Sequence, residues 1–241
     1  MAERLKISAI IVAAGSGSRM NSQEKKQFMD LRGVPVLVYS LKAFEENPAI
    51  DQVTVVTAEE DMERVLRLCI EYRISKVKNI APGGNMRFRS VYNGLCTLPG
   101  DTDYVLIHDA ARPCVTQEVI RNCIKGAVQE GACVAAVRVK STIKRGDADG
   151  FAIETPARDS LYEVQTPQAF SFRLIAEAYA SLQRTISEYN SDISWVTDDA
   201  VIVENMTSAK VKLVDGDYAN IKITTPEDLK IAAALLPAEI P

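Results

Sequence analysis

Short apolar runs alternate with amphipathic segments along almost the whole chain. Runs typical of buried strands lie at residues 7–12, 53–57, 104–107, 132–139 and 221–224. Apolar residues recur at helical spacing in residues 35–46, 62–70, 116–128 and 171–182, and again from residue 225. This alternation predicts an α/β fold in which helices cover both faces of a mostly parallel sheet. Because ligands bind beyond the carboxyl ends of strands in such sheets, we expect a site among residues 13–20, 83–90 and 108–113.

Three places in the sequence are typical of helix starts. Thr116 precedes a helical segment as an N-cap residue, and Thr225 does the same with Pro226 at the first helical position. Thr197, followed by two aspartates, also indicates a helix start, with no further role needed.

One stretch, residues 140–163, breaks the alternation. It holds the sequence Gly-Asp-Ala-Asp-Gly at 146–150 between two short strand-like pieces, which predicts a β-arm with a turn at its tip. An arm without a covering helix often packs on a partner subunit. Since linkers and internal repeats are missing from the sequence, we expect a single domain over residues 1–241 with an arm at about 140–163.

The charge and the rare residues exclude several classes of function. The chain has 241 residues, and 28 basic residues against 32 acidic ones give a net charge of -4, which argues against a nucleic-acid binder. His108 is the one histidine, so zinc sites built from several histidines are excluded.

The five cysteines form no CxxC pair and indicate small core residues in a reducing compartment. The apolar run at residues 9–14 is too short for a signal peptide or membrane span, so we expect a cytoplasmic protein without membrane contact.

A glycine-rich stretch, AAGSGSRM at residues 13–20, directly follows the first predicted strand. Its backbone N–H groups can cradle an anion, and Arg19, Lys25 and Lys26 add cations suited to a polyphosphate. The stretch is not a Walker A loop. Met20 replaces the small third residue of a dinucleotide-binding fingerprint, which argues against a nicotinamide dehydrogenase. A structural turn followed by a solvated basic loop is the alternative interpretation.

Two further motifs lie at predicted strand ends. In GGNMRFRS, Gly83 and Gly84 can bring backbone against a flat base, with Ser90 capping or contacting it; a turn and helix start is the alternative. In HDAARP, Asp109 can hold a sugar hydroxyl or a metal ion, whereas His108 is more typical of a buried, satisfied histidine. Lys222 lies within the predicted strand 221–224, where it would face either solvent or the site.

A series of motifs occurs in a fixed order between residues 7 and 232: AAGSGSRM, KKQF, GGNMRFRSV, LIHDAARP, STIK, TPQAF, TDDA and NIKITTPEDL. In these motifs the chain closely resembles the 2-C-methyl-D-erythritol 4-phosphate cytidylyltransferases, CTP-using enzymes of the non-mevalonate isoprenoid pathway. The resemblance implies a Rossmann-like three-layer α/β/α fold with a protruding β-arm, and a homodimer formed through the arms. It also implies transfer of CMP from CTP to an alcohol phosphate with release of pyrophosphate. The implied cofactor is Mg²⁺, bound mainly through the CTP phosphates, and no protein ligand for it is assigned.

The resemblance also implies roles for the motif residues. The expected catalytic cations are Arg19, Lys26 and Lys222. The residues expected to bind CTP are Ala13, Ala14, Gly15, Gly17, Gly83, Gly84, Asn85, Arg87, Ser90, Asp109 and Ala110. The residues expected to bind the alcohol phosphate are Asp109, Arg112, Thr142, Arg158, Thr166, Thr197 and Lys222, with Thr142 and Arg158 supplied by the partner's arm.

Two positions depart from the family pattern. Lys25 stands where the family usually has proline, which predicts a more flexible loop in which Lys25 competes with Lys26. Ser141 stands where an aspartate usually precedes the threonine of the arm, so the arm contact and the acceptor identity are open. Ribitol-5-phosphate cytidylyltransferase is the alternative enzyme, although the two alanines of HDAARP favour the methylerythritol enzyme. A CTP-binding regulator without turnover is the alternative from another class.

Overall fold

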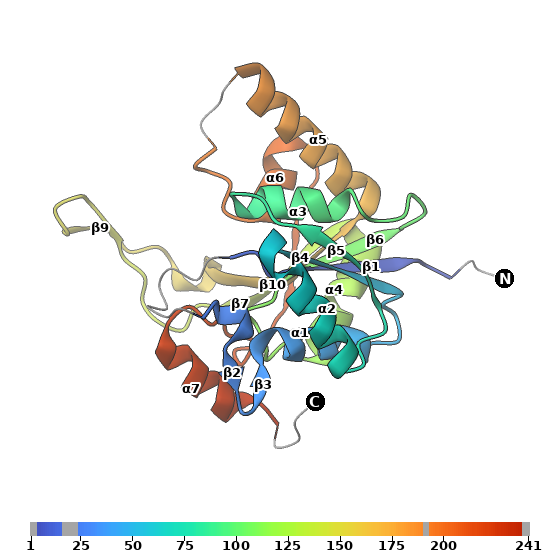
Figure 1. The fold of residues 1–241 in the computed structure, drawn as a ribbon. Helices are drawn as coiled ribbons and strands as arrows, with labels where there is room; N and C mark the ends of the chain where they lie inside the picture. Colours follow the sequence, from blue (N-terminus) through green and yellow to red (C-terminus); the bar gives the residue numbers. More distant parts are fainter. Residues whose placement is uncertain (1–3, 16–23, 190–192, 238–241) are drawn as a thin grey trace.

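A seven-stranded sheet forms the centre of the molecule (Figure 1). The computed structural model describes residues 4–15, 24–189 and 193–237. In spatial order the strands are β11 (Lys212–Asp215), β7 (Ala132–Arg138), β10 (Tyr162–Ser171), β6 (Tyr104–Asp109), β1 (Ile7–Val12), β4 (Gln52–Thr57) and β5 (Val77–Pro82). All neighbouring strands are parallel except β10, which runs antiparallel to both β6 and β7. The predicted α/β fold with a mostly parallel sheet is confirmed.

Helices cover both faces of this sheet and enclose two hydrophobic cores. The first core packs against α1 (Val36–Glu45), α2 (Met62–Glu71), α4 (Gln117–Glu130) and α7 (Pro226–Leu235). The second packs against α3 (Arg87–Leu95), α5 (Phe172–Tyr189) and α6 (Asp199–Met206), which lie together above the sheet in Figure 1. Successive strand residues point to opposite faces, so Ile11 enters the first core and Ile10 the second.

Two of the predicted helix starts have the expected caps. The Thr116 hydroxyl accepts a hydrogen bond from the Val119 N–H at the start of α4. At the start of α7, Thr225 and Asp228 form a capping box with Pro226 at the first helical position. At α6 the cap is Asp198, one residue after Thr197, and its carboxylate accepts from the Val201 N–H at 2.9 Å.

The predicted strand at 221–224 is wrong. These residues form an irregular segment, and the Ile223 N–H donates to the Ala111 carbonyl at 2.8 Å rather than to a strand partner. The sheet edge is instead β11, which the sequence did not predict, and β10 was also missed. The strand end expected before residue 83 is the end of β5. An irregular path at residue 222 releases its side chain from strand alternation, so that Lys222 faces the end of β6.

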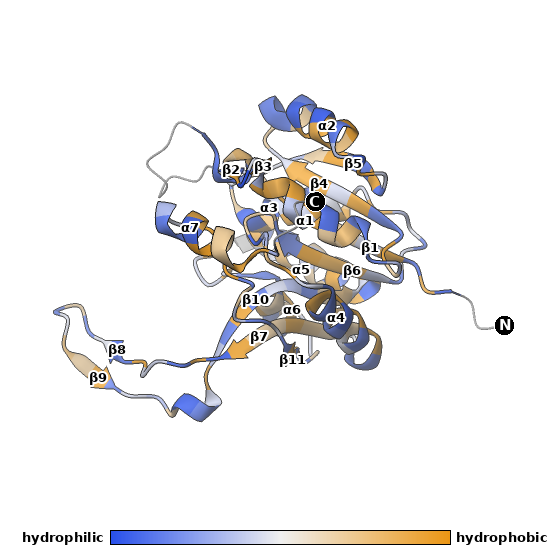
Figure 2. Cartoon of the chain, turned by 90° about the horizontal axis from the view of Figure 1, so that it is seen from below, coloured by the Kyte–Doolittle hydropathy of each residue, from blue (hydrophilic) through white to orange (hydrophobic). Residues whose placement is uncertain are grey.

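The arm is a short hairpin of β8 (Arg145–Gly146) and β9 (Ala152–Glu154) that projects from the body of the molecule (Figures 1 and 2). Gly150 in its turn has φ +86°, a left-handed conformation that favours glycine. Phe151 is 72% exposed and Ile153 52% exposed, so the arm presents apolar surface. Its far boundary lies earlier than predicted, because Tyr162 and Glu163 already belong to β10.

Short elements complete the described chain. They are the 3-10 helices η2 (Lys26–Phe28), η3 (Glu59–Asp61) and η4 (Arg158–Ser160) and the paired strands β2 (Asp30–Leu31) and β3 (Val34–Pro35). All five cysteines are free and four are buried. Of the helices in the described ranges, none combines the length and apolar character that crossing a membrane requires.

Candidate active site

A cavity of about 470 Å³ opens at the carboxyl ends of β1 and β6. It lies where an open parallel sheet is expected to bind ligands. Its walls come from five parts of the chain: the end of β1, the η2 segment, the β5–α3 loop with the start of α3, the end of β6 and the segment around residue 222. The lining residues are Val12, Ala13, Ala14, Gly15, Lys26, Gln27, Gly84, Asn85, Met86, Arg87, Ser90, Asp109, Ala110, Ala111 and Lys222.

Two glycines allow the β5–α3 loop to lie close against its neighbours. A Cβ atom at Gly83 would overlap the Cβ of Ala14, and one at Gly84 would overlap the Cβ of Arg89. The Ser90 hydroxyl accepts a hydrogen bond from the Gly84 N–H at 3.0 Å and donates to the Met86 carbonyl at 3.3 Å. Ser90 therefore fixes the loop that forms one wall of the cavity, and it also lines that cavity.

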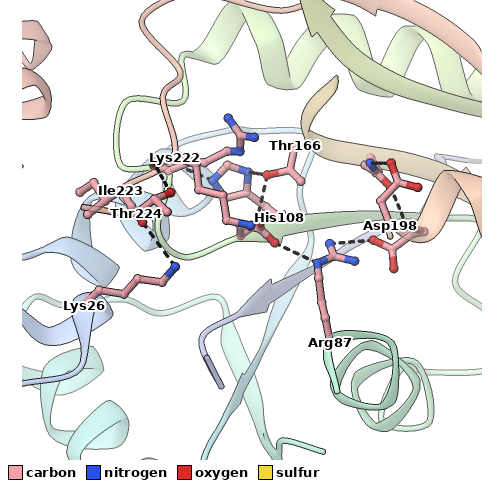
Figure 3. Close-up of polar contacts among 12 residues, drawn as sticks. Lys26, Arg87, His108, Thr166, Asp198, Lys222, Ile223 and Thr224 are labelled. Carbon is pink, nitrogen blue, oxygen red and sulfur yellow. Dashed lines mark hydrogen bonds and ion pairs between the residues drawn. The ribbon is translucent and has the colours of Figure 1, made fainter. Parts of the chain in front are cut away.

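Lys26 reaches the opposite side of this cavity. Its Nζ donates to the Ile223 carbonyl at 3.3 Å (Figure 3). The next residue, Gln27, is buried and donates from Nε2 to the Ala13 carbonyl at 2.7 Å, which ties η2 to the end of β1. Two expected residues, Gly17 and Arg19, lie outside the described residues.

Asp109 ends β6 and is held between two cations. Its Oδ1 lies 3.2 Å from Arg87 Nε, and its Oδ2 lies 2.5 Å from Lys222 Nζ. Burial alone would favour the protonated acid, but the charges of Arg87 and Lys222 outweigh it and hold the pKa of Asp109 well below its usual range. Asp109 is therefore a permanent carboxylate that orients both cations.

Arg87 connects Asp109 to a deeper buried carboxylate. Its Nη2 lies 2.8 Å from Oδ2 of Asp199, and Oδ1 of Asp199 accepts a hydrogen bond of 2.6 Å from the Tyr179 hydroxyl. Burial opposes the charge of Arg87, yet Asp199 and Asp109 raise its pKa well above the ordinary value. Arg87, expected to bind CTP, lines the cavity with its guanidinium already paired to these two carboxylates.

A second cavity of about 230 Å³ adjoins the first and shares Arg87, Asp109 and Lys222 with it. Its other walls are the loop after β6, the first half of β10 and the segment before α6. The remaining lining residues are Arg112, Val164, Gln165, Thr166, Gln168, Thr197 and Asp198. The structure thus brings together Asp109, Arg112, Thr166, Thr197 and Lys222, the expected acceptor-binding residues outside the arm.

Arg112 supplies a buried positive charge to this second cavity. Its side chain is 7% exposed, and Nη1 donates to the Asn220 carbonyl at 2.6 Å. Burial lowers the pKa of Arg112, an effect that the charge of Asp109 partly offsets. Its Nε has no hydrogen-bond partner among the described residues. A guanidinium in this situation suits an anionic ligand, because an unsatisfied buried donor is costly.

His108 is buried and satisfied, as expected. Its Nε2 lies 3.2 Å from the Arg112 carbonyl, which can only accept, so Nε2 carries the proton. Nδ1 then accepts from the Thr166 hydroxyl at 2.9 Å, and that hydroxyl accepts from the Asp109 N–H at 3.1 Å (Figure 3). Burial lowers the pKa of His108 to about 4, so the imidazole is neutral near pH 7. His108 therefore orients Thr166 and the 109–112 loop.

The arm residues lie apart from both cavities. Thr142 and Arg158 are exposed, and neither lines the cavities of its own chain. Arg158 makes a hydrogen bond of 3.4 Å from Nη1 to the Lys140 carbonyl.

The described residues contain no cluster of three or more histidine, cysteine or acidic side chains able to hold a metal ion. Asp109 is the one carboxylate lining the first cavity as described, and it is already paired with two cations. This donor set fits Mg²⁺ coordinated mainly by substrate phosphates and water, with at most one protein carboxylate.

The sequence did not single out two members of the site. Asp199 was interpreted only as part of a helix start, and Tyr179 lies unnamed within the predicted helical segment 171–182. Asp199 becomes important through its ion pair with Arg87, which starts α3 far from it in sequence, and Tyr179 becomes important through its hydrogen bond to Asp199. The adjacent acidic pair in TDDA was the available signal, since a cap needs only the first aspartate.

Comparison with known proteins identifies the family. The family model for 2-C-methyl-D-erythritol 4-phosphate cytidylyltransferase (IspD) matches residues 7–238. A relative of that name from Lachnospira eligens is 48% identical over 229 residues, which cover 95% of this chain and 98% of the relative. Another from Alkaliphilus oremlandii is 44% identical over 96% of this chain and 95% of its own length. The crystal structure of 4-diphosphocytidyl-2C-methyl-D-erythritol synthase from Anaerococcus prevotii superposes with a TM-score of 0.80 at 32% identity, covering 96% of this chain and 98% of that one. The chain therefore belongs to the 2-C-methyl-D-erythritol 4-phosphate cytidylyltransferase family.

Proposed function

We propose that this protein transfers CMP from CTP to the phosphate of 2-C-methyl-D-erythritol 4-phosphate. The products are 4-diphosphocytidyl-2-C-methyl-D-erythritol, an isoprenoid precursor, and pyrophosphate. The observation that carries the proposal is that the two adjoining cavities share Arg87, Asp109 and Lys222. A nucleotide in the larger cavity and an alcohol phosphate in the smaller one would meet at these side chains.

The larger cavity supports the binding of CTP. Gly84, with Ala13, Ala14, Asn85 and Ser90, lines this cavity and would hold the cytosine. Gly83 would contribute by letting the β5–α3 loop lie close against Ala14. Asp109 and Ala110 would meet the ribose. The triphosphate would extend toward Gly15 and Lys26, with Gly17 and Arg19 completing the phosphate contacts.

The reaction joins two phosphates without a covalent enzyme intermediate. An oxygen of the acceptor phosphate attacks the α-phosphorus of CTP, the new P–O bond forms, and the bond to the bridging β-phosphate oxygen breaks in line. A phosphate dianion is itself the nucleophile, so no general base is needed. This agrees with a chain whose one histidine is buried and engaged with Thr166 and the Arg112 carbonyl. Catalysis then depends on positioning and on cations that stabilise the developing charge.

Lys222 supplies a cation at the boundary between the cavities. Its Nζ already lies 2.5 Å from the carboxylate of Asp109, which holds the ammonium beside the place where the phosphates would meet. Arg112, Thr166 and Thr197 would bind the methylerythritol phosphate on the far side of this boundary. Mg²⁺, held mainly by the CTP phosphates with Asp109 as the nearest protein carboxylate, would neutralise phosphate charge.

We further propose that the active form is a homodimer. Thr142 and Arg158 belong to the arm segment 140–163 and line neither cavity of their own chain, so a second copy would be needed for them to reach an acceptor phosphate. The exposed Phe151 and Ile153 give the arm an apolar surface suited to such packing. Each chain would act as a single cytidylyltransferase domain over residues 1–241. We place the reaction in the cytoplasm, the compartment that supplies CTP.

The direct test is pyrophosphate release from CTP and Mg²⁺ with 2-C-methyl-D-erythritol 4-phosphate, with ribitol 5-phosphate in a parallel reaction. Release with the methylerythritol phosphate is the expected result and makes Ser141 in the arm compatible with the usual acceptor. Equal or faster release with ribitol 5-phosphate would retain the chemistry and change the substrate. CTP binding without release from either acceptor would identify a nucleotide-binding regulator.

A further inference from the structure

The segment that carries Lys26 into the larger cavity is attached to the start of α2. Lys25 Nζ lies 2.6 Å from Asp61 Oδ2 and 2.7 Å from Glu60 Oε1. We call these contacts the Lys25 anchor. They join residue 25 to positions 35 and 36 residues further along the chain, at the end of η3. The Lys25 ammonium is therefore paired with the carboxylates of Glu60 and Asp61, and it does not compete with Lys26.

Arg64 on α2 reinforces the attachment on both sides of Lys26. Its Nη1 lies 2.6 Å from Glu24 Oε1, and its guanidinium stacks 4.2 Å from the centre of the Phe28 ring. On the inner side, Gln27 binds the Ala13 carbonyl. The backbone around Lys26 is thus held by α2 from outside and by β1 from inside.

The carboxylate of Asp61 pairs with Lys25 and does not cap α2. Asp61 occupies the residue before α2, where aspartate usually accepts a hydrogen bond from a backbone N–H of the first turn. Its side chain makes no such bond. It is 13% exposed and pairs with Lys25, which is 28% exposed. This partly buried pair is less screened than a surface pair, whereas Glu60 is 70% exposed and contributes less.

The backbone at Lys25 has φ -67° and ψ 135°. Proline is fixed at nearly the same φ, so it can hold this conformation without any side-chain contact. The backbone conformation that precedes Lys26 can therefore be stabilised in two ways. In this chain an ion pair of the residue-25 side chain stabilises it, and a proline at residue 25 would fix it through its pyrrolidine ring.

We propose that Lys25 is a positioning residue for Lys26, acting through its ion pair with Asp61 to fix the backbone that directs the Lys26 ammonium into the cavity. The inference rests on the proposed function, in which Lys26 contacts the triphosphate. Since the reaction depends on cations in fixed places, loosening this backbone lowers the fraction of bound CTP that meets Lys26 correctly. The loss falls on kcat more than on substrate binding, because the base and ribose contacts remain.

The test compares Lys25→Ala, Asp61→Asn and Lys25→Pro with the unaltered protein. The matched control is Arg67→Ala, which removes the exposed Glu63 pair on the same helix and touches neither cavity. We expect Lys25→Ala and Asp61→Asn to lower kcat about tenfold, with the KM for the acceptor unchanged. We expect Lys25→Pro and Arg67→Ala to stay within about twofold of the unaltered protein. Thermal unfolding of each variant checks that the fold is retained.

Salt provides a second readout that a structural role alone would not move. Between about 0.05 M and about 0.5 M KCl, the kcat of the unaltered protein should fall relative to that of Lys25→Pro, whose anchor carries no charge. Normal kcat in Lys25→Ala would overturn the inference. Equal losses in Lys25→Ala and Lys25→Pro would also overturn it, because they would mean that the ammonium itself contacts substrate. Failure of the proposed function is distinguishable, since the unaltered protein would then release no pyrophosphate.

Discussion

Asp109 and Lys222 are 113 positions apart in the chain, and their side chains meet at 2.5 Å between Oδ2 and Nζ. The two residues also line both cavities. A carboxylate that stays ionised keeps the ammonium at the boundary before any substrate arrives. In the proposed reaction this placement would be a form of preorganisation, since the cation would not have to move when the phosphates meet.

Removing either lysine of the site should damage turnover far more than CTP binding. We expect Lys26→Ala and Lys222→Ala each to lower kcat by about 10²–10³, equivalent to about 3–4 kcal/mol of transition-state stabilisation. The CTP dissociation constant, measured by calorimetry, should change much less. Lys230→Ala, on an exposed position of α7, is the control for loss of one positive charge. Near-normal turnover in a lysine variant would remove that lysine from the catalytic group.

Adding a methyl group at Gly83 should weaken CTP binding. The new Cβ would overlap the Cβ of Ala14, so the β5–α3 loop must move away from the end of β1. We expect Gly83→Ala to raise the CTP dissociation constant about tenfold or more, since a displaced wall no longer fits the base. Gly100→Ala adds the same methyl group where nothing lies within 4 Å, and its binding should be normal. Equal CTP affinities in the two variants would contradict the close-approach argument.

Losing the Tyr179 hydroxyl should destabilise the fold. That hydroxyl donates to the buried Asp199 carboxylate at 2.6 Å, and hydrogen bonds to charged groups are the stronger kind. We expect Tyr179→Phe to cost about 2 kcal/mol in the free energy of unfolding, measured with urea. Tyr39→Phe, which removes a bond to the neutral Leu31 carbonyl, should cost about half as much. The reverse order would show that Asp199 relies on Arg87 alone.

His108 should make the fold less stable in mild acid. The folded chain keeps the imidazole neutral down to about pH 4, whereas the unfolded chain protonates it below about pH 6.5. Protons therefore favour the unfolded state, and stability from this group falls as the pH drops from about 6.5 to about 4. The loss amounts to about 3 kcal/mol at most. Urea unfolding at several pH values should show a weaker dependence for His108→Gln; parallel pH curves would contradict the assignment.

Mixed dimers should restore activity if the arms are exchanged. Lys26→Ala is defective in the body and Arg158→Ala in the arm, so each alone should be impaired at every site. In a mixed dimer, one site combines the intact body of one chain with the intact arm of the other. We expect co-refolded mixtures to recover about a quarter of the normal activity, since half of the dimers are mixed and each has one intact site. A mixture no more active than the average of its two components would mean that each arm serves its own chain or none.

Much of the fold could be predicted because its signals are local. The β1, β4, β6 and β7 strands are continuous apolar runs, and α2 and α4 have clear apolar faces. The β10 strand was missed because its sequence, YEVQTPQAFS, contains a proline and polar residues where a buried strand usually has aliphatic ones. Those polar residues are explained by the fold, since Gln165 and Thr166 face the second cavity. The segment at 221–224 has strand-like composition, but it lies beyond the sheet.

The candidate site could be predicted only where one short sequence motif contains several of its residues. The loops at 83–90 and 108–112 each bring their residues together directly, and the structure lines the cavities with them. Three features depend on tertiary structure: the ion pair of Arg87 with Asp199, the ion pair of Lys25 with Asp61, and the irregular backbone that brings Lys222 to Asp109. Local spacing contains no signal for them, because each joins segments that approach only in the folded chain.

The boundary at Asp109 divides the site into halves with separate origins in the chain. Apart from the shared residues, the larger cavity, where we propose that the nucleotide binds, is built from residues 12–15, 26–27, 84–86, 90 and 110–111. The smaller cavity, where we propose that the acceptor binds, is built mainly from residues 164–166, 168 and 197–198. If the proposed placement of the substrates is right, replacement of β10 side chains and of the segment before α6 would change the alcohol that is accepted without disturbing the nucleotide contacts. In an engineering experiment, exchange of these two short segments between related enzymes would then exchange their acceptor preference. The dependence on CTP would stay unchanged, because the rest of the chain would bind the nucleotide.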